Sequence, residues 1–266
     1  MLVLMLMACD NRTDERTQTQ AHAYPAGASP CTAPALAGVP QEATVRTPAG
    51  VAVVIRTPRN YRADVAHPLL VVFAAADMSP TASERFTGFT PFATRAGYVV
   101  AYAQHLRPSL AAMRKLAGVA VEVGRHVCID PQRIFLSGHS DGGTAATALA
   151  VQSESTSWVA GLAPSAAGFT GEDLASFRCP TPRPVLVWHG ARDRLFPGWG
   201  LEAAQWWANC NRCDLTPPTA VAGCLRYTGC AQPVHYCEGA HGHTAWPTDG
   251  APRTLKFFND AQQNFL

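Results

Sequence analysis

Apolar residues in this chain gather in short continuous runs, and polar or turn-forming residues separate one run from the next. Six runs have the length of buried strands: residues 68–76 (PLLVVFAAA), 98–102 (YVVAY), 133–137 (RIFLS), 158–164 (WVAGLAP), 183–190 (RPVLVWHG) and 233–239 (PVHYCEG). Strands that are apolar on both faces are typical of a parallel sheet covered by helices on either side. The pattern therefore predicts such a sheet at the centre of the molecule.

The segments between these runs are helical or mixed in pattern, and one hairpin precedes them. Helices are expected over residues 109–125, 142–152 and 200–210, and residues 82–97 have a helical or mixed character. Residues 43–58 contain two β-rich runs around Thr-Pro-Ala-Gly, which has turn chemistry. Because strands and helices alternate, the sequence predicts an α/β fold with a mostly parallel central sheet flanked by helices.

The length and the composition near the N-terminus predict one folded domain behind a short leader. A chain of 266 residues suits a single α/β domain. Residues 10–30 are polar and rich in Pro, Gly and Ala, with no apolar period, as in a flexible tether. The single domain is therefore expected to cover residues 31–266.

Residues 1–9, MLVLMLMAC, have the pattern of an export signal. The run Leu-Met-Ala-Cys that ends at Cys9 resembles the lipobox of bacterial lipoproteins, whose cysteine is lipidated and becomes the mature N-terminus. An ordinary export signal and a chance apolar start are the alternatives, and the run is shorter than the roughly 20 apolar residues that span a bilayer. We expect an exported protein, either an envelope lipoprotein or a secreted or periplasmic one, that contacts a membrane only through a lipid anchor on Cys9.

The remaining cysteines form an even set, as in a disulfide-stapled protein. They are Cys31, Cys128, Cys179, Cys210, Cys213, Cys224, Cys230 and Cys237. In an oxidising compartment they allow up to four disulfides, and the sequence leaves their pairing open. Cys210 and Cys213 form a C-x-x-C, which also occurs in zinc sites, but Cys224 and Cys230 have five residues between them rather than two. The sequence therefore favours disulfide-stapled loops and predicts no metal site.

The charge pattern lacks the usual signature of a protein that binds nucleic acids. The formal net charge is +2, only 15% of the residues are charged, and no run of Lys or Arg occurs. Proteins that bind nucleic acids usually carry a basic patch or stripe. Nothing in the sequence implies a metal or an organic cofactor, so any chemistry is expected to come from side chains.

A serine between glycines follows the strand predicted at residues 133–137. The segment Gly138-His139-Ser140-Asp141-Gly142 has the pattern G-x-S-x-G and leads directly into an Ala-rich helix. A sharp strand-to-helix turn needs small residues around the serine, which then stands out as a nucleophile. The N–H of Asp141 is the expected donor to a negatively charged oxygen formed during the reaction.

Candidate acid and base residues follow two later strands. Asp193 comes three residues after the strand at 183–190, and His241 and His243 follow the strand at 233–239. In α/β sheets, ligands bind at the carboxyl ends of the strands, so these segments are expected to meet. A serine hydroxyl needs a neutral imidazole to take its proton, and a carboxylate fixes that imidazole. The chain order Ser, Asp, His is the order used by α/β-hydrolases.

Three segments together resemble one group of α/β-hydrolases, the secreted poly(3-hydroxybutyrate) depolymerases and feruloyl esterases. The segments are CIDPQRIFLSGHSDGG (128–143), PVLVWHGARDRLFP (184–197) and GAHGHTAWP (239–247), and the likeness covers roughly residues 50–250. The resemblance implies that Ser140 is the nucleophile, Asp193 the acid and His243 the base. This group usually has one residue fewer between the base and the following Trp-Pro, so His241 stays open as the alternative base.

A second departure concerns the loop after the strand at 68–76. The resembled group often has His-Gly there, where a backbone N–H completes the oxyanion hole. This chain has Phe73-Ala74-Ala75-Ala76-Asp77 instead. The second oxyanion donor is expected from the backbone of Ala75 or Ala76.

The candidates for substrate contact are His139, Trp199 and Trp246, since rings near the acid and base segments could hold an aryl group or a polymer chain. The resemblance implies an exported serine esterase that forms an acyl-enzyme on hydroxyalkanoate or hydroxycinnamoyl esters, small or polymeric, without a cofactor. The alternative is a non-catalytic α/β-hydrolase-like envelope lipoprotein that binds a ligand or partner. Its support is the altered loop at residues 74–77 and the crowded pair of histidines at 241 and 243.

Overall fold

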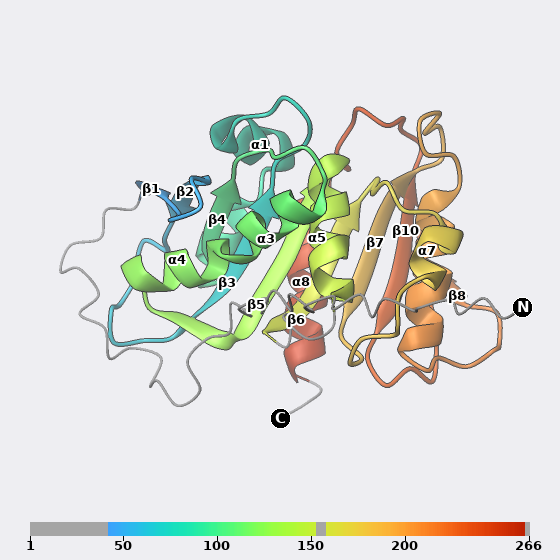
Figure 1. The fold of residues 1–266 in the computed structure, drawn as a ribbon. Helices are drawn as coiled ribbons and strands as arrows, with labels where there is room; N and C mark the ends of the chain where they lie inside the picture. Colours follow the sequence, from blue (N-terminus) through green and yellow to red (C-terminus); the bar gives the residue numbers. More distant parts are fainter. Residues whose placement is uncertain (1–41, 153–157, 264–266) are drawn as a thin grey trace, which may run out of the picture.

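A mostly parallel sheet of ten strands forms the centre of the computed structural model, which describes residues 42–152 and 158–263 (Figure 1). The strand order is β1-β2-β4-β3-β5-β6-β7-β10-β9-β8. The bounds are β1 Glu42–Arg46, β2 Ala52–Arg56, β3 His67–Phe73, β4 Val99–Ala103, β5 Ile129–His139, β6 Val159–Ser165, β7 Val185–Gly190, β8 Thr219–Val221, β9 Cys224–Arg226 and β10 Val234–Gly239. The predicted α/β fold with a mostly parallel sheet is confirmed.

The parallel part of the sheet runs from β4 across β3, β5, β6 and β7 to β10. The predicted hairpin β1–β2 joins it through an antiparallel β2–β4 pair, and the short strands β9 and β8 extend the other edge in antiparallel fashion. Because parallel strands end at the same edge, the segments that follow β5, β7 and β10 come together there.

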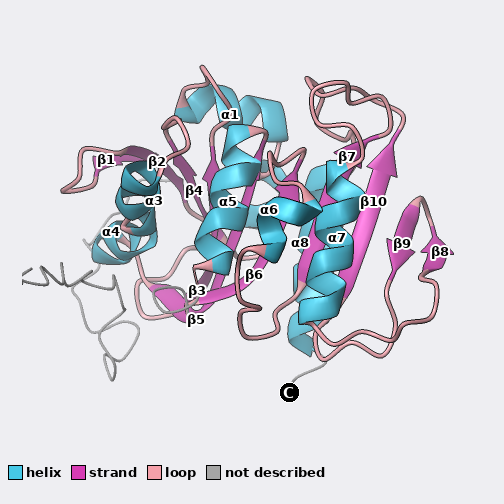
Figure 2. Ribbon diagram, turned by 45° about the vertical axis from the view of Figure 1, so that its right-hand side comes forward, coloured by secondary structure: helices cyan, strands magenta, loops and turns pink. Residues whose placement is uncertain are grey.

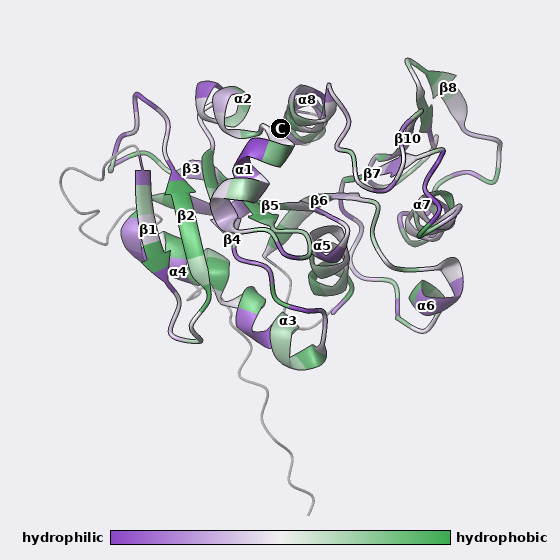
Figure 3. Ribbon diagram, turned by 90° about the horizontal axis from the view of Figure 1, so that it is seen from above, coloured by the Kyte–Doolittle hydropathy of each residue, from purple (hydrophilic) through white to green (hydrophobic). Residues whose placement is uncertain are grey.

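Helices cover both faces of the sheet because each central strand buries alternate side chains on opposite faces. In β3, Leu69 and Val71 pack into one core, whereas Leu70 and Val72 pack into the other. The first core takes side chains from α3 (Leu110–Ala117), α4 (Val119–His126), α5 (Asp141–Val151), α6 (Gly171–Ala175) and α7 (Trp199–Cys210). The second takes side chains from α2 (Thr90–Arg95) and α8 (Gly250–Gln263). Figure 2 shows α5, α6 and α7 in front of the strands, and Figure 3 shows α2 and α8 across the sheet from α3 and α5.

Some elements differ from those that the sequence predicts. The helix expected over 109–125 is two helices, α3 and α4, which meet at Gly118, where the N–H bonds to the Lys115 carbonyl and closes a turn. Glycine has a low helix propensity, which accounts for the break. The short α1 (Pro80–Thr87) and α2 divide the mixed segment, and β5 begins four residues before the apolar run. The elements α6, α8, β8 and β9 have no predicted counterpart. The elements α6, β8 and β9 contain only three to five residues, which is too short for a clear pattern, and α8 begins with Gly-Ala-Pro, which is not typical of a helix start.

Three disulfides lie within the described residues and tie the last third of the chain together. They join Cys179 to Cys210, Cys213 to Cys230 and Cys224 to Cys237. Both cysteines of the C-x-x-C therefore have sulfur partners, and no cluster of metal-ligating side chains occurs in residues 42–152 and 158–263. Disulfides of this number indicate an oxidising, extracytoplasmic compartment.

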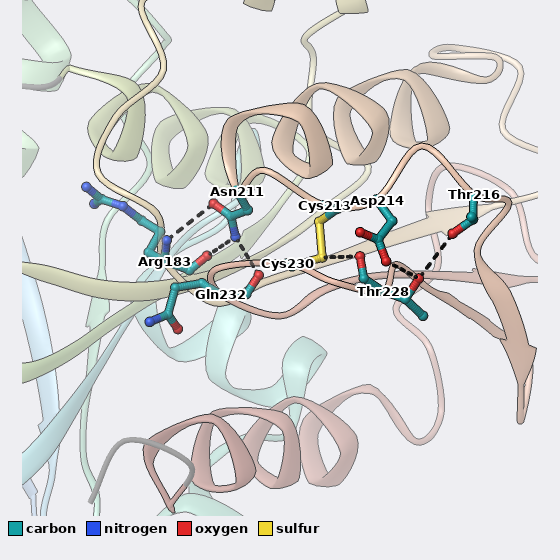
Figure 4. Close-up of a disulfide and its surroundings, with 8 residues drawn as sticks. All are labelled: Arg183, Asn211, Cys213, Asp214, Thr216, Thr228, Cys230 and Gln232. Atoms are coloured by element: carbon teal, nitrogen blue, oxygen red, sulfur yellow. Dashed lines mark hydrogen bonds between the residues drawn. A yellow bond between two sulfur atoms is a disulfide. The ribbon is translucent and has the colours of Figure 1, made fainter.

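The disulfide between Cys213 and Cys230 lies beside a buried polar junction (Figure 4). Asn211, directly after α7, is fully buried, and its side-chain N–H groups donate to the carbonyls of Arg183 and Gln232 at 2.7 and 3.0 Å. Because Arg183 and Gln232 precede β7 and β10, this junction joins the end of α7 to the starts of both strands. That edge of the sheet is opposite the strand ends that carry Asp193 and His243, so most of the cross-links secure the framework rather than the site itself.

Reduction of the disulfides is expected to lower the melting temperature by more than 10 °C. The cross-linked cysteines are 31, 17 and 13 residues apart, and loop-closure entropy assigns each about 3 to 4 kcal/mol of unfolding free energy. Thermal melts with and without dithiothreitol measure the shift. Activity measured well below the lowered melting temperature should change little, and an unchanged melt after complete reduction would contradict this role.

Two predictions concern residues near the N-terminus that the structure does not describe. Cys9, the leader at 1–9, the tether at 10–30 and Cys31 lie outside the described residues, so lipidation of Cys9 and the domain start at residue 31 stay predictions. Within the described ranges, no helix is both long and apolar enough to cross a bilayer.

Candidate active site

Ser140 stands at a sharp turn between β5 and α5. Its backbone has φ 53° and ψ −119°, a conformation that non-glycine residues rarely adopt, and α5 begins at the next residue. Such a conformation costs about 1–3 kcal/mol and persists only when the surrounding structure enforces it. The N-terminus of α5 points its free N–H groups and its positive dipole end toward this turn.

Gly138 and Gly142 allow this turn because neighbouring backbone atoms leave no room for a side chain. A Cβ at Gly138 would come within 2.5–2.7 Å of the backbone of Gly142 and Phe73, and a Cβ at Gly142 would collide with the Phe73 carbonyl. The helix start therefore packs directly on the end of β3. This close approach also places the loop after β3, which begins at Ala74, beside the first turn of α5.

A continuous chain of hydrogen bonds joins Ser140, His243 and Asp193. The Ser140 Oγ lies 2.8 Å from His243 Nε2, and His243 Nδ1 lies 2.8 Å from Asp193 Oδ2. His243 lies in the loop after β10, and Asp193 lies in the loop after β7. The three residues are 50 to 103 positions apart in the chain, and the parallel sheet brings them together at one edge.

Asp193 is held rigidly, with only 5% of its surface exposed. Its Oδ1 accepts hydrogen bonds from the N–H groups of Leu195 and Phe196, both at 2.9 Å. Burial by itself would raise the pKa of the Asp193 carboxyl, but the Phe196 N–H and the His243 ring outweigh it and lower the pKa below the ordinary value. His189, at the end of β7, is buried, and its Nε2 lies 3.0 Å from the Phe196 carbonyl. Asp193 is therefore a fixed carboxylate at neutral pH.

The alternative base, His241, lies elsewhere. Its ring packs against the backbones of Gly190 and Gly239, where a Cβ on either glycine would come within 2.8 Å of a ring atom. Its Nδ1 faces the neighbouring Gly242 carbonyl at 3.1 Å, and its Nε2 is buried without a hydrogen-bond partner among the described residues. The described contacts therefore join His243, and not His241, to Ser140 and Asp193, which favours His243 as the candidate base.

The candidate oxyanion donors lie on the two segments that meet at Gly142. In the described part of the chain, the N–H groups of Asp141, Ala75 and Ala76 donate to no protein acceptor, whereas the Ala74 N–H donates to the Ala103 carbonyl. Ala75 is buried and Ala76 is exposed. Free N–H groups on adjacent segments can bind an oxyanion, and this role of the three residues stays a prediction.

An ion pair that the sequence pattern does not indicate lies beside the nucleophile. His105, in the loop after β4, lies 2.8 Å through Nε2 from a carboxylate oxygen of Asp141. Both side chains are only partly exposed. The pair fixes the carboxylate of the residue after Ser140 and forms a polar wall on this side of the site.

An aromatic wall lies next to His243. The ring of Phe196 meets the His243 ring edge-on with centroids 4.8 Å apart, and Trp199 stacks on Phe196 at 4.5 Å. Trp199 thus reaches the site through Phe196, a residue that is not among the candidates predicted from the sequence. Its position three residues after Asp193, in the loop that carries the acid, was the available signal.

The other two predicted substrate contacts, Trp246 and His139, pack against protein side chains, which does not favour a role in substrate binding. Trp246 packs edge-on against Phe86, Phe89 and His139 in the second core. His139 is 4% exposed, and protein groups occupy both of its ring nitrogens. Both ring nitrogens of His139 are thus engaged within the protein, whereas Trp246 Nε1 is buried without a hydrogen-bond partner among the described residues.

A serine at the turn after a central parallel strand, with helices on both faces of the sheet, places the chain in the class of α/β-hydrolase folds. Solved structures share this architecture. Acetyl xylan esterase from Aspergillus awamori has a TM-score of 0.65 at 14% identity, covering 83% of this chain and 99% of that one. S-formylglutathione hydrolase FrmB from Staphylococcus aureus has a TM-score of 0.58 at 13% identity, covering 84% and 96%. Est1E from Butyrivibrio proteoclasticus has 0.56 at 11%, covering 85% and 99%.

Sequence comparison finds one curated relative of limited extent. NocK of Nocardia uniformis subsp. tsuyamanensis, provisionally named an esterase, is 32% identical over 151 residues. The match covers 52% of this chain and 43% of NocK, so it spans less than half of the relative. No protein-family model matches the chain.

Proposed function

We propose that this protein is an exported serine hydrolase of carboxylic esters. The observation that carries the proposal is the hydrogen-bonded chain from Ser140 through His243 to Asp193, at the edge of the sheet where α/β proteins bind ligands. The esterase relative and the esterases among the structural neighbours support the same reaction class.

In the proposed reaction, His243 Nε2 takes the proton of the Ser140 hydroxyl as Oγ bonds to the ester carbonyl carbon. Asp193 holds the His243 ring in the correct tautomer and stabilises its positive charge. The N–H of Asp141, with that of Ala75 or Ala76, donates to the oxyanion. The carbon–oxygen bond to the alcohol then breaks, and His243 returns the proton to the leaving oxygen. Water repeats the sequence on the acyl-enzyme and releases the acid.

The substrate class that we propose is a hydroxycinnamoyl or hydroxyalkanoate ester, small or polymeric. The proposal follows the resemblance of three sequence segments, and the aromatic wall of Phe196 and Trp199 beside His243 supports it, since stacked rings suit an aryl group or a chain of apolar units. The chain needs no cofactor or nucleic acid for this reaction. The disulfides support export, and the lipid anchor on Cys9 remains a separate proposal.

Hydrolysis of p-nitrophenyl acetate and butyrate by the full, disulfide-bonded chain tests the reaction class. We expect saturable hydrolysis of both esters, and then turnover of methyl ferulate or poly(3-hydroxybutyrate) above that of acetylated xylan. A folded protein with no activity on any of these esters would overturn the proposal and favour a non-catalytic ligand-binding protein.

A further inference from the structure

His139, the residue directly before Ser140, has a buried ring whose polar contacts all lie within the protein. Phe86, Trp246 and His243 surround the ring, with centroids 5.2, 6.3 and 5.5 Å away. The side chain therefore points away from solvent, although the next residue, Ser140, is only half-buried. A polar ring in such a place needs hydrogen bonds that compensate for its burial.

Both ring nitrogens of His139 have partners, and the partners fix the position of its proton. Nε2 lies 2.6 Å from the backbone carbonyl of His243, which can only accept, so Nε2 carries the hydrogen. Nδ1 then accepts from the hydroxyl of Ser165, 3.0 Å away. Ser165 is fully buried, and its carbonyl accepts the N–H of Ser140 at 2.9 Å.

This arrangement ties the base to the nucleophile a second time. Asp193 fixes the ring of His243 through Nδ1, while His139 fixes the backbone of the same residue through its carbonyl. Because His139 and Ser140 are neighbours in the chain, a shift of the loop after β10 would break the contact with the strand that presents the nucleophile. We propose that His139 is a positioning residue that sets the backbone of His243 relative to Ser140. The inference rests on the proposed function and adds a residue to it.

The charge state of His139 suits this task. Burial lowers its pKa to about 4, so the ring stays neutral and keeps its donor and acceptor in place through the pH range from about 5 to 8. The titratable groups that face it are His243, His241 and Asp193. A cationic ring 5.5 Å from His243 would oppose the imidazolium that the reaction forms. A neutral ring holds the base without this penalty.

Two replacements of His139 separate its hydrogen bonds from its packing. His139→Phe keeps an aromatic ring against Phe86 and Trp246 but removes both hydrogen bonds. His139→Gln keeps one acceptor and one N–H donor. With p-nitrophenyl butyrate, we expect His139→Phe to lower kcat about 10- to 100-fold with KM within about twofold, since a displacement near 1 Å can cost about a hundredfold. His139→Gln should recover kcat to within about fivefold of the wild type.

Histidine 15N and 1H NMR of the full chain supplies a readout that is independent of turnover. In the wild type at pH 5, we expect His139 as the neutral Nε2–H tautomer and a protected Nδ1–H proton on His243. His139→Phe should lose or broaden the His243 signal, and His139→Gln should retain it. Thermal melts establish that each variant is folded.

The outcomes separate this inference from the proposed function. Absence of ester hydrolysis in the wild type, with the His243 proton still dependent on His139, would overturn the function and leave the positioning contact supported. A His139→Phe variant that keeps kcat within about threefold, or an unchanged His243 proton, would overturn the inference. So would a folded His139→Gln variant as impaired as His139→Phe, because packing alone would then explain the loss.

Discussion

Replacing Ser140 by alanine is expected to lower kcat for p-nitrophenyl butyrate by about 10⁵- to 10⁶-fold, to the limit of detection. The proposed acyl-enzyme forms on Ser140 Oγ, and alanine has no atom that could take its place. Losses of this size occur when a serine hydrolase loses its nucleophile. Stopped or initial-rate assays of purified, disulfide-bonded protein measure the change.

Ser137→Ala, in β5 three residues before Ser140, provides the matched control. Ser137 is fully buried, and its hydroxyl donates to the Ala163 carbonyl at 2.7 Å. Its loss should lower the free energy of unfolding by about 1 kcal/mol and leave kcat nearly unchanged. Equal activity in Ser140→Ala and the wild type would contradict the assignment of the nucleophile.

The second large effect is expected for His243→Ala, which should lower kcat by a factor similar to that of Ser140→Ala. Among the described residues, the His243 ring is the only group that contacts both Ser140 Oγ and Asp193, and His243→Ala removes it. The serine proton would then have no base. KM should change much less than kcat, because the ring is not part of the proposed aromatic wall.

His241→Ala is the matched control for the base, two residues away in the same loop. Its ring fills the groove between Gly190 and Gly239, so its removal should lower the melting temperature and reduce kcat by less than about tenfold. Steady-state kinetics of both variants at pH 8 make the comparison. The reverse result, with His241→Ala inactive and His243→Ala active, would assign the base to His241.

The elements with strong local patterns were predictable from the sequence. The apolar runs of β3, β4, β6 and β7 are buried on both faces, so their composition indicates parallel strands without further information. The helices α3 and α4 were predicted as one, because their apolar periodicity continues across Gly118. The short strand β9 pairs with β10 and is joined to it by the Cys224–Cys237 disulfide, and β8 pairs with β9. These are tertiary contacts, which the local sequence does not indicate.

The part of the site that was predictable from the sequence is the turn that carries Ser140. The glycines around Ser140 are required by contacts with Phe73, so the motif itself indicates the turn. The choice between His241 and His243 depended on the path of a loop after β10, and spacing alone left it open. His105 and Phe196 reach the site from separate loops, and the inward turn of His139 depends on Ser165 and on the loop carrying His243. These contacts arise from tertiary structure, which the sequence pattern does not specify.

The most direct test of the proposed hydrolase is reaction of the full, disulfide-bonded chain with a fluorophosphonate probe, followed by mass spectrometry of the peptides. An alkoxide-like serine activated by its base attacks the phosphorus and displaces fluoride, whereas ordinary serines do not react. We predict a single adduct on Ser140 that disappears in Ser140→Ala and His243→Ala and persists in Ser137→Ala. Absence of any adduct on the folded protein, or an adduct that survives Ser140→Ala, would contradict the proposed function.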